Sequence, residues 1–379
     1  MLRERLRFNW QELSGSFGDL GTDLPLLVGM IMAAQLDSAN VFTLFGVAQI
    51  LTGVFYGLPM PMQPLKAMAV IVMTEKLTGS ILWAGGLMVG AMMLVLTSTG
   101  ILTRLARWIP QPVVRGCQLG LGLSLAAVAL KTYLPAGDLF GYLLGVMGFL
   151  ILLLLPKERG VPAGLLVVLL GVGVAISRVL AEPELQLTIA WQLPYLRPLD
   201  PQALIPGLVL LALPQLPLSI ANAVIATQQT VHDLFPDRPL SIRQIGLTYS
   251  LTNLILPFFG GVPLCHGCSG LAGHYALGAR TGGAVVIYGS LYLLLGLFFG
   301  SSVDKLLEIF PLSILGVILL FEAWVLMGFI KDQAAMPANW MITLLVGAIA
   351  LSVPQGFLVG TLVGTTLYYL SRKMPLQLS

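Results

Sequence analysis

Apolar runs of about 18 or more residues recur along the whole chain, and each can cross the roughly 30 Å hydrocarbon core of a bilayer as a helix. Of the 379 residues, 57% are hydrophobic and 10% are charged, whereas a soluble domain carries roughly 25% charged residues. The sequence therefore predicts an all-α polytopic protein embedded in the lipid bilayer. Its net charge of +3 is too small to indicate a nucleic-acid partner.

Proline, glycine and charged residues divide the chain into fourteen predicted segments. The first seven cover 14–34, 40–58, 63–76, 80–102, 113–131, 138–155 and 161–180. The second seven cover 203–230, 241–259, 267–279, 282–300, 304–330, 337–353 and 355–371. The longest polar connection separates the two sets, so we expect a first repeat at 1–180, a linker at 181–202 and a second repeat at 203–379.

The basic residues test this count, because cytoplasmic loops of membrane proteins are enriched in Lys and Arg. With a cytoplasmic N-terminus, the even-numbered loops and both tails hold fourteen of the twenty basic residues: Arg3, Arg5, Arg7, Arg104, Arg107, Arg115, Lys157, Arg159, Arg238, Arg243, Arg280, Lys331, Arg372 and Lys373. We therefore expect both termini in the cytoplasm and the protein in the cell (inner) membrane. The N-terminus lacks an apolar region with a cleavage site, so no cleaved signal peptide is expected.

Seven is an odd number, so the second half must enter the membrane inverted relative to the first. Inverted repeats are common in secondary transporters, which bind substrate near the midplane where the repeats meet. Two stretches agree in order: TDLPLLVGMIMA (22–33) overlays PQLPLSIANAVIA (214–226), and YGLPMPMQPLKAM (56–68) overlays GGVPLCHGCSGLA (260–272). The second overlay shares a Gly-x-Pro start and places Gln63 opposite Gly267.

The third segment of each half is too short to cross the bilayer, since about 14 residues span roughly 21 Å. Each follows an extended Pro/Gly stretch, and non-helical backbone at membrane depth survives only inside protein or along a cavity. We expect two half-helices whose N-termini meet at one point. Helix N-termini carry unpaired N–H donors and a partial positive charge, which suits an anion.

Polar residues gather at these predicted N-termini. Gln63 and Lys66 are expected on the opening turn of the first half-helix, and Cys268, Ser269 and Gly270 on that of the second, next to His266. Backbone N–H groups at 63–66 and 268–270 are expected to bind the anion. Gln63 has an alternative role as a local cap, and Lys66 has alternatives as a snorkelling lysine or the partner of an acid. An ionisable residue inside the membrane indicates function by default.

Asp19 and Asp23 lie four residues apart and so share one helical face. Either carboxylate is a candidate to couple transport by titration or to pair with Lys66, and the alternative is that both cap Gly-rich backbone. Thr22 beside them is a predicted substrate contact. Their counterparts in the eighth segment are the uncharged Gln215 and Ser219, again i, i+4, which we predict to face the same cavity. His266 is a third coupling candidate, because a histidine titrates in the working pH range.

The sequence CHGC (265–268) raises the alternative of a metal site or a membrane-embedded enzyme. A closed zinc site needs four ligands, and no second cluster supplies the rest, so we predict no metal, no cofactor and no catalysis. Three cysteines also predict no disulfide framework. Glu322 in the twelfth segment and His274 in the tenth have no evident partner in the sequence and are left unassigned.

Four ordered motifs together resemble the molybdate transporter family, a branch of the sulfate permease superfamily: GSFGDLGTDLPLL, PMPMQPLKAMA, PQLPLSIANAVIAT and GGVPLCHGCSGLAGHYALGARTGG. The resemblance implies a seven-plus-seven inverted repeat in which a core of segments 1–4 and 8–11 moves against a gate of segments 5–7 and 12–14. It implies molybdate as substrate, held between the N-termini of half-helices 3 and 10. We predict that the side chains of Gln63, Lys66, Gln215 and Ser269 help to bind it there. Like the molybdate branch, this sequence shows only SRKMPLQLS where most sulfate permeases carry a STAS domain.

The leading hypothesis is therefore a secondary active molybdate transporter, with symport of a proton or cation. Tungstate and sulfate share the charge and shape of molybdate and stay open as substrates, and a homodimer stays open as its assembly. The alternative is a symporter of another small anion or a nucleobase on the same fold. Nucleobase symporters commonly place glutamates in segments 8 and 10, whereas segment 8 here offers Gln215 and segment 10 has no carboxylate. A channel is a further alternative.

Overall fold

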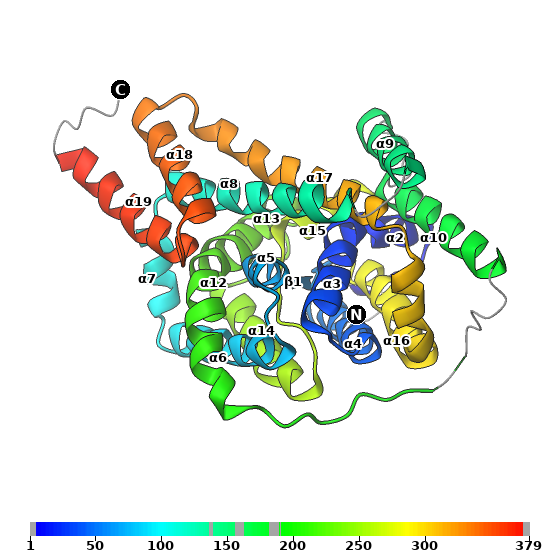
Figure 1. Ribbon diagram of the computed structural model, residues 1–379. Coiled ribbons are helices and arrows are strands. Elements are labelled where there is room, and N and C mark those ends of the chain that lie inside the picture. Colours follow the sequence, from blue (N-terminus) through cyan, green and yellow to red (C-terminus); the bar gives the residue numbers. More distant parts are fainter. Residues whose placement is uncertain (1–4, 136–138, 156–162, 182–188, 190, 374–379) are drawn as a thin grey trace.

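The structure is a computed structural model that describes residues 5–135, 139–155, 163–181, 189 and 191–373. Arg3, Lys157 and Arg159, three of the residues expected on the cytoplasmic side, lie outside these ranges, as does the first part of the predicted linker. Helices from the two halves of the sequence surround a short strand near the middle of the molecule (Figure 1).

The elements of the first half are α2 (Trp10–Ser16), η1 (Phe17–Asp19), α3 (Leu20–Ala34), α4 (Ser38–Tyr56), β1 (Gln63–Pro64), α5 (Lys66–Glu75), α6 (Gly79–Ser98), α7 (Ile101–Trp108), α8 (Gln111–Val128), η2 (Ala129–Tyr133), α9 (Leu139–Leu154) and α10 (Ala163–Ala181). Those of the second half are η4 (Pro201–Ala203), α11 (Leu204–Pro206), η5 (Gly207–Ala212), α12 (Leu213–Leu218), η6 (Ser219–Ala226), α13 (Thr227–Leu234), α14 (Ile242–Ile255), η7 (Leu256–Phe259), β2 (Leu264–Cys265), α15 (Cys268–Ala276), α16 (Gly283–Ile309), α17 (Leu312–Gly328), η8 (Phe329–Gln333), α18 (Pro337–Ser352) and α19 (Gly356–Lys373).

Seven helical stretches in the described ranges are long and apolar enough to cross a membrane: Trp10–Ala34, Ser38–Tyr56, Gly79–Ser98, Gln111–Tyr133, Ala163–Ala181, Pro201–Leu234 and Leu312–Gln333. Three shorter apolar helices are Leu139–Leu154, Gly283–Phe299 and Pro337–Ser352. With α14, α19 and the two half-helices α5 and α15, these seven and three stretches correspond to the fourteen predicted segments. The protein is a multi-pass α-helical membrane protein, as predicted.

Two predicted boundaries are wrong. The fourth segment was expected to run to residue 102, but α6 ends at Ser98 and a separate short helix, α7, starts at Ile101 after Gly100, whose φ is +73°. The stretch at 301–303 was expected to separate segments 11 and 12, but α16 continues through it to Ile309. The break comes instead at Pro311, because the residue before a proline is pushed out of the helical region.

The two halves of the chain interlock in space. Helix α4 of the first half packs along α16 of the second, and α6 packs along α14. Helix α8 packs along both α17 and α18, and the three helices lie in the upper part of the view in Figure 1. The predicted repeats at 1–180 and 203–379 are therefore not separate bodies, since helices of each repeat pack against helices of the other.

The strands β1 and β2 join the two half-helices at the centre. They pair antiparallel, with Gln63 opposite Cys265 and Pro64 opposite Leu264. Because each strand leads into a half-helix, this pairing brings the N-termini of α5 and α15 side by side while the helices run apart. The sequence predicted the meeting point but not the strands.

Two side-chain amides clamp the strands in equivalent ways. Gln49 of α4 donates to Met62 O at 2.8 Å and accepts from Met62 N at 3.0 Å. Asn253 of α14 donates to Leu264 O at 2.6 Å and accepts from Leu264 N at 2.9 Å. A buried strand end needs partners for all its backbone groups. Each half of the chain supplies them in the same way, and this match supports an inverted repeat.

The predicted overlay of the third segments is wrong by two residues. Helix α5 begins at Lys66 and α15 at Cys268, so these two positions correspond. The overlay on the shared Gly-x-Pro start had placed Lys66 opposite Gly270. The stretch from proline to helix is two residues longer in the first half than in the second, and a gapless overlay cannot reveal this.

Candidate functional site: the meeting point of two half-helices

Helix α5 starts with a buried lysine. Lys66 is the first helical residue, with Leu65 in an extended conformation before it, and only 5% of its surface is exposed. Gln63 is fully buried and lies on β1. The expectation that Gln63 stands on the opening turn of α5 is wrong, because the proline at position 64 keeps the chain extended for two more residues.

The N-terminus of α5 is capped from another helix. The side-chain oxygen of Gln215 on α12 accepts from the N–H groups of Ala67 at 3.0 Å and Met68 at 3.2 Å. The N–H of Leu65 donates to Pro263 O at 3.0 Å. Gln215 thus satisfies first-turn donors that a helix leaves unpaired, and these donors are not free for an anion in this form of the protein.

The N-terminus of α15 has no side-chain cap of its own, because its N-cap residue is Gly267. A Cβ at Gly267 would overlap the side-chain oxygen of Gln63, and a Cβ at Gly270 would overlap a carboxylate oxygen of Asp19. Glycine is therefore required at both positions for these two polar side chains to approach the first turn of α15.

Gln63 connects the two half-helices to Asp19. Its amide nitrogen donates to both carboxylate oxygens of Asp19, at 2.6 and 2.8 Å, and lies 3.4 Å from the hydroxyl of Ser269. Asp19 ends the short helix η1, which packs against α15. A carboxylate therefore already occupies the place beside the α15 N-terminus where an anion was expected.

Lys66 pairs with a glutamate rather than with an aspartate. Its ammonium nitrogen lies 2.5 Å from an oxygen of Glu322 on α17 and 3.4 Å from the hydroxyl of Ser269. The other oxygen of Glu322 accepts from the hydroxyl of Thr22 at 3.2 Å. Glu322, which the sequence left unassigned, is therefore the ion-pair partner of Lys66. The signal that could have revealed this pair is a single carboxylate in the apolar stretch SILGVILLFEAWVLM, because a buried acid needs a partner.

Asp23 is fully buried behind this network. Neither of its oxygens has a hydrogen-bond partner among the described residues, although the hydroxyl of Tyr288 on α16 lies near enough to interact with it electrostatically. Asp19 and Glu322 also act on Asp23 through their charges. An ionised carboxylate is costly to bury where so few donors reach it.

The two histidines hydrogen-bond to groups other than Lys66. His266 donates through Nδ1 to Pro61 O at 3.2 Å, and its Nε2 lies 2.7 Å from the hydroxyl of Thr248. His274, which the sequence left unassigned, donates through Nδ1 to Gly15 O at 2.7 Å. In the part of the chain that the structure describes, no three His, Cys, Asp or Glu side chains gather as a metal site requires.

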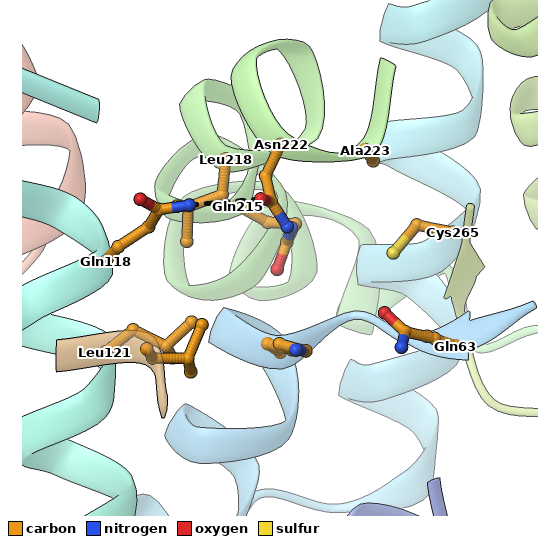
Figure 2. Close-up of a pocket in the computed structure, with 10 residues that line it drawn as sticks. Gln63, Gln118, Leu121, Gln215, Leu218, Asn222, Ala223 and Cys265 are labelled. Carbon is orange, nitrogen blue, oxygen red and sulfur yellow. Dashed lines mark hydrogen bonds between the residues drawn. The ribbon is translucent and has the colours of Figure 1, made fainter. Parts of the chain in front are cut away.

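A small cavity opens at this meeting point (Figure 2). Its lining residues come from α5, α8, α12, η6, α17 and the strands: Gln63, Lys66, Gln118, Leu121, Gln215, Leu218, Asn222, Ala223, Cys265 and Leu326. Its volume is about 20 Å³, and one water molecule needs roughly 10–15 Å³. A tetrahedral oxyanion therefore fits only if side chains move.

The structure brings most predicted site residues together and sets a few apart. Gln63, Lys66, Ser269, Thr22 and Asp19 form one hydrogen-bonded network with Glu322, as described above. Ser219 accepts from the Gln215 amide at 3.2 Å and lies 2.7 Å from the hydroxyl of Tyr249, so it supports Gln215. The thiol of Cys268 donates to Asn222 at 3.4 Å, and Asn222 accepts from Gln118 at 3.1 Å.

Comparison with solved structures identifies the fold. The transmembrane domain of a cyanobacterial bicarbonate transporter, BicA, is 16% identical, with a TM-score of 0.65 over 93% of this chain and 99% of that domain. Murine Slc26a9, an anion transporter in the inward-facing state, is 13% identical, with a TM-score of 0.73 over 96% of this chain and 68% of that protein. At these identities the likeness concerns the fold alone, and the fold is that of these transporters.

Comparison with sequences identifies the family. The family described as molybdate transporter of the MFS superfamily matches residues 11–125 and 207–326. Molybdate transporter 2 of Arabidopsis thaliana is 33% identical in an alignment that covers 88% of this chain and 82% of the relative. Molybdate transporter 1 of Chlamydomonas reinhardtii is 29% identical over 93% of this chain and 90% of the relative. The first matched stretch contains α5 and the second contains α15, each with its polar residues, and the chain belongs to the molybdate transporter family.

Proposed function

We propose that the protein is a secondary active transporter that carries molybdate across the cell membrane by alternating access. The relatives named molybdate transporters support the substrate. The observation that carries the proposal is the convergence of Lys66, Gln63, Ser269 and the uncapped first turn of α15 on one buried point. These groups are donors and a cation, which suit an oxyanion.

The proposed binding mode places molybdate between Lys66 and the N–H groups of residues 268–270. Ser269 would donate a hydroxyl, and Gln63 would donate its amide once Asp19 no longer occupies it. Gln215 would act mainly by holding α5, since its oxygen is engaged with that helix. The proposed moving parts are a core of segments 1–4 and 8–11 and a gate of segments 5–7 and 12–14.

The charges around the site support coupling to protons or a cation. Asp19, Asp23 and Glu322 are three carboxylates, and Lys66 is the one cation that acts on them among the described residues. Ionised together they sum to three negative charges against one positive charge, and molybdate would add two negative charges. Uncompensated buried charge costs several kcal/mol per ion. We propose that Asp19 and Asp23 are neutralised by protons or a cation when molybdate binds.

The orientation is part of the same proposal. Among the basic residues expected in the cytoplasm, Arg115 and Lys331 lie near one another in the fold, at the start of α8 and in η8, two elements that pack together. A shared side of the membrane for these two loops supports cytoplasmic termini.

Uptake into proteoliposomes tests the proposal. Purified protein is expected to accumulate molybdate, measured by mass spectrometry, with saturable kinetics, which a channel would not show. Tungstate and sulfate, which resemble molybdate in charge and shape, are expected to compete in proportion to their similarity in size. Robust uptake of uracil or bicarbonate without any uptake of molybdate would refute it.

One variant distinguishes the proposed transporter from the alternative in which CHGC forms a metal or enzyme site. Cys265 and Cys268 are free thiols, and Cys265 lines the cavity. Replacing both with serine is expected to leave molybdate uptake within about twofold, since serine keeps the size and a donor. The metal reading would be favoured if the double variant lost uptake and if a chelator abolished uptake by the wild type until zinc was added back.

A further inference from the structure

Glu322, on helix α17, forms an ion pair with Lys66, the cation of the proposed site. Helix α17 packs on α3, α8 and α9, and α5 reaches it through the contact of Lys66 with Glu322 at 2.5 Å. Both side chains are largely buried, with 6% of Lys66 and 12% of Glu322 exposed. The hydroxyl of Thr22 completes the contact by donating to the second carboxylate oxygen at 3.2 Å.

The carboxylate of Glu322 uses the donors that an oxyanion would use. One oxygen accepts from the ammonium of Lys66 and the other accepts from the hydroxyl of Thr22. The hydroxyl of Ser269 lies 3.4 Å from the same ammonium. The cavity beside Lys66 is too small for a tetrahedral oxyanion as it stands. An anion can reach Lys66 only by displacing Glu322 or by sharing the lysine with it.

Among the described residues, no cation other than Lys66 pairs with Glu322. Its charge acts on Asp19 and Asp23 as well as on Lys66. The charged side chains on the other described elements packed against α17 are engaged elsewhere: Arg115 pairs with Asp332, Arg178 donates to Ile309 O, and Lys131 and Lys331 are exposed. Loss of Lys66 would leave Glu322 as a third uncompensated carboxylate.

We propose that Glu322 is an internal competitor that holds Lys66 until a dianion displaces it, and that it thereby selects dianions over monoanions. A monoanion offers Lys66 the same single charge that Glu322 already supplies, so the exchange gains nothing electrostatically. A dianion offers two charges and more acceptor oxygens, so it can displace the carboxylate. The displacement also separates α17 from α5, which ties substrate binding to the relation between these two helices. This inference rests on the proposed function.

Binding to purified full-length protein tests this inference. Isothermal titration gives the affinity for molybdate, and competition with perchlorate, a tetrahedral monoanion, gives the selectivity for charge. Glu322→Gln keeps the shape and removes the charge. We expect it to bind molybdate about tenfold more tightly, equivalent to about 1.4 kcal/mol, and to bind perchlorate that the wild type excludes.

The matched control is Asp332→Asn, which removes another carboxylate paired with a basic side chain, Arg115, at 2.5 Å. It is expected to leave both affinities unchanged. Glu322→Asp serves as a second variant if the glutamine variant fails to fold. It keeps the charge but draws it back by one methylene, so we expect an intermediate gain in molybdate affinity.

Unchanged molybdate affinity and unchanged exclusion of perchlorate in both Glu322 variants would overturn the inference, and Glu322 would then be only a structural partner of Lys66. Wild-type protein that binds neither molybdate nor tungstate would instead overturn the proposed function. The two failures are distinguishable, because the first appears only in the variants and the second already in the wild type.

Discussion

Gln63 binds both carboxylate oxygens of Asp19 through one amide nitrogen, at 2.6 and 2.8 Å. This contact fixes the orientation of the amide, whose oxygen points toward Gly267. Gln63 lies on β1, and Asp19 ends η1 beside α15, so the pair ties the strand of the first repeat to the half-helix of the second. The donor that holds Asp19 is also the donor that molybdate would need.

Gln63→Glu is expected to abolish molybdate binding, because it replaces the donor by a carboxylate that faces Asp19, and two close carboxylates repel each other. We expect at least about a hundredfold loss of affinity by isothermal titration, since a charged hydrogen bond is also lost. The matched control is Gln229→Glu, in which an exposed glutamine that donates to Asp233 at 2.7 Å is changed in the same way. Equal affinity in the Gln63 variant and the wild type would remove Gln63 from the site.

Gly267→Ala and Gly270→Ala are expected to block transport without unfolding the protein. An added Cβ would overlap the Gln63 oxygen in the first variant and the Asp19 carboxylate in the second. Gly173→Ala is the control, since a Cβ there meets no atom within 4 Å. Uptake is expected to fall more than about tenfold in the first two variants and to persist in the third. Normal uptake in all three would contradict the described approach of these side chains.

Two substitutions of Gln215 are expected to affect stability and molybdate binding separately. Gln215→Leu removes the acceptor for two N–H groups of α5, and loss of a helix cap costs about 1 kcal/mol, so the thermal unfolding midpoint in detergent should fall. Gln215→Glu keeps an acceptor and should retain stability, but its charge should repel molybdate. A leucine variant as stable as the wild type would show that this cap contributes little.

The sequence predicted the architecture because its signals are local. Apolar length, proline positions and the Lys/Arg distribution each act within one segment, and they gave the number of segments and the meeting of two half-helices. The pairing of β1 with β2 could not be predicted, since the strands are two residues long and about 200 residues apart. Their register depends on Gln49 and Asn253, which look like ordinary polar residues in helices.

The partners in the site depend on tertiary contacts that no spacing reveals. The sequence offered Asp19 and Asp23 as acidic partners for Lys66, but Lys66 contacts Glu322 because α17 passes beside α5, and Asp19 instead accepts from Gln63. Gln215 shares helical spacing with Ser219, as predicted, yet its oxygen points at α5 rather than into open space. Polar residue types were thus recognisable from sequence, but the assignment of donors to acceptors was not.

Transport is expected to increase as the external pH falls. Protonation neutralises Asp19 and Asp23, which removes the repulsion that opposes a dianion, so acid favours binding. Asp23→Asn makes one of these positions permanently neutral, and its uptake should depend less steeply on pH between about pH 5 and 8. Initial rates in proteoliposomes at several external pH values measure this slope. A variant with the full wild-type slope would exclude Asp23 from the coupling.

The central claim is tested most directly by accumulation of molybdate in proteoliposomes under an imposed pH gradient, acidic outside. The account predicts that wild-type protein concentrates molybdate above the external level, that dissipation of the gradient with an ionophore stops the accumulation, and that Lys66→Gln abolishes it. Proteoliposomes that take up uracil or bicarbonate but no molybdate, with or without the gradient, would contradict it.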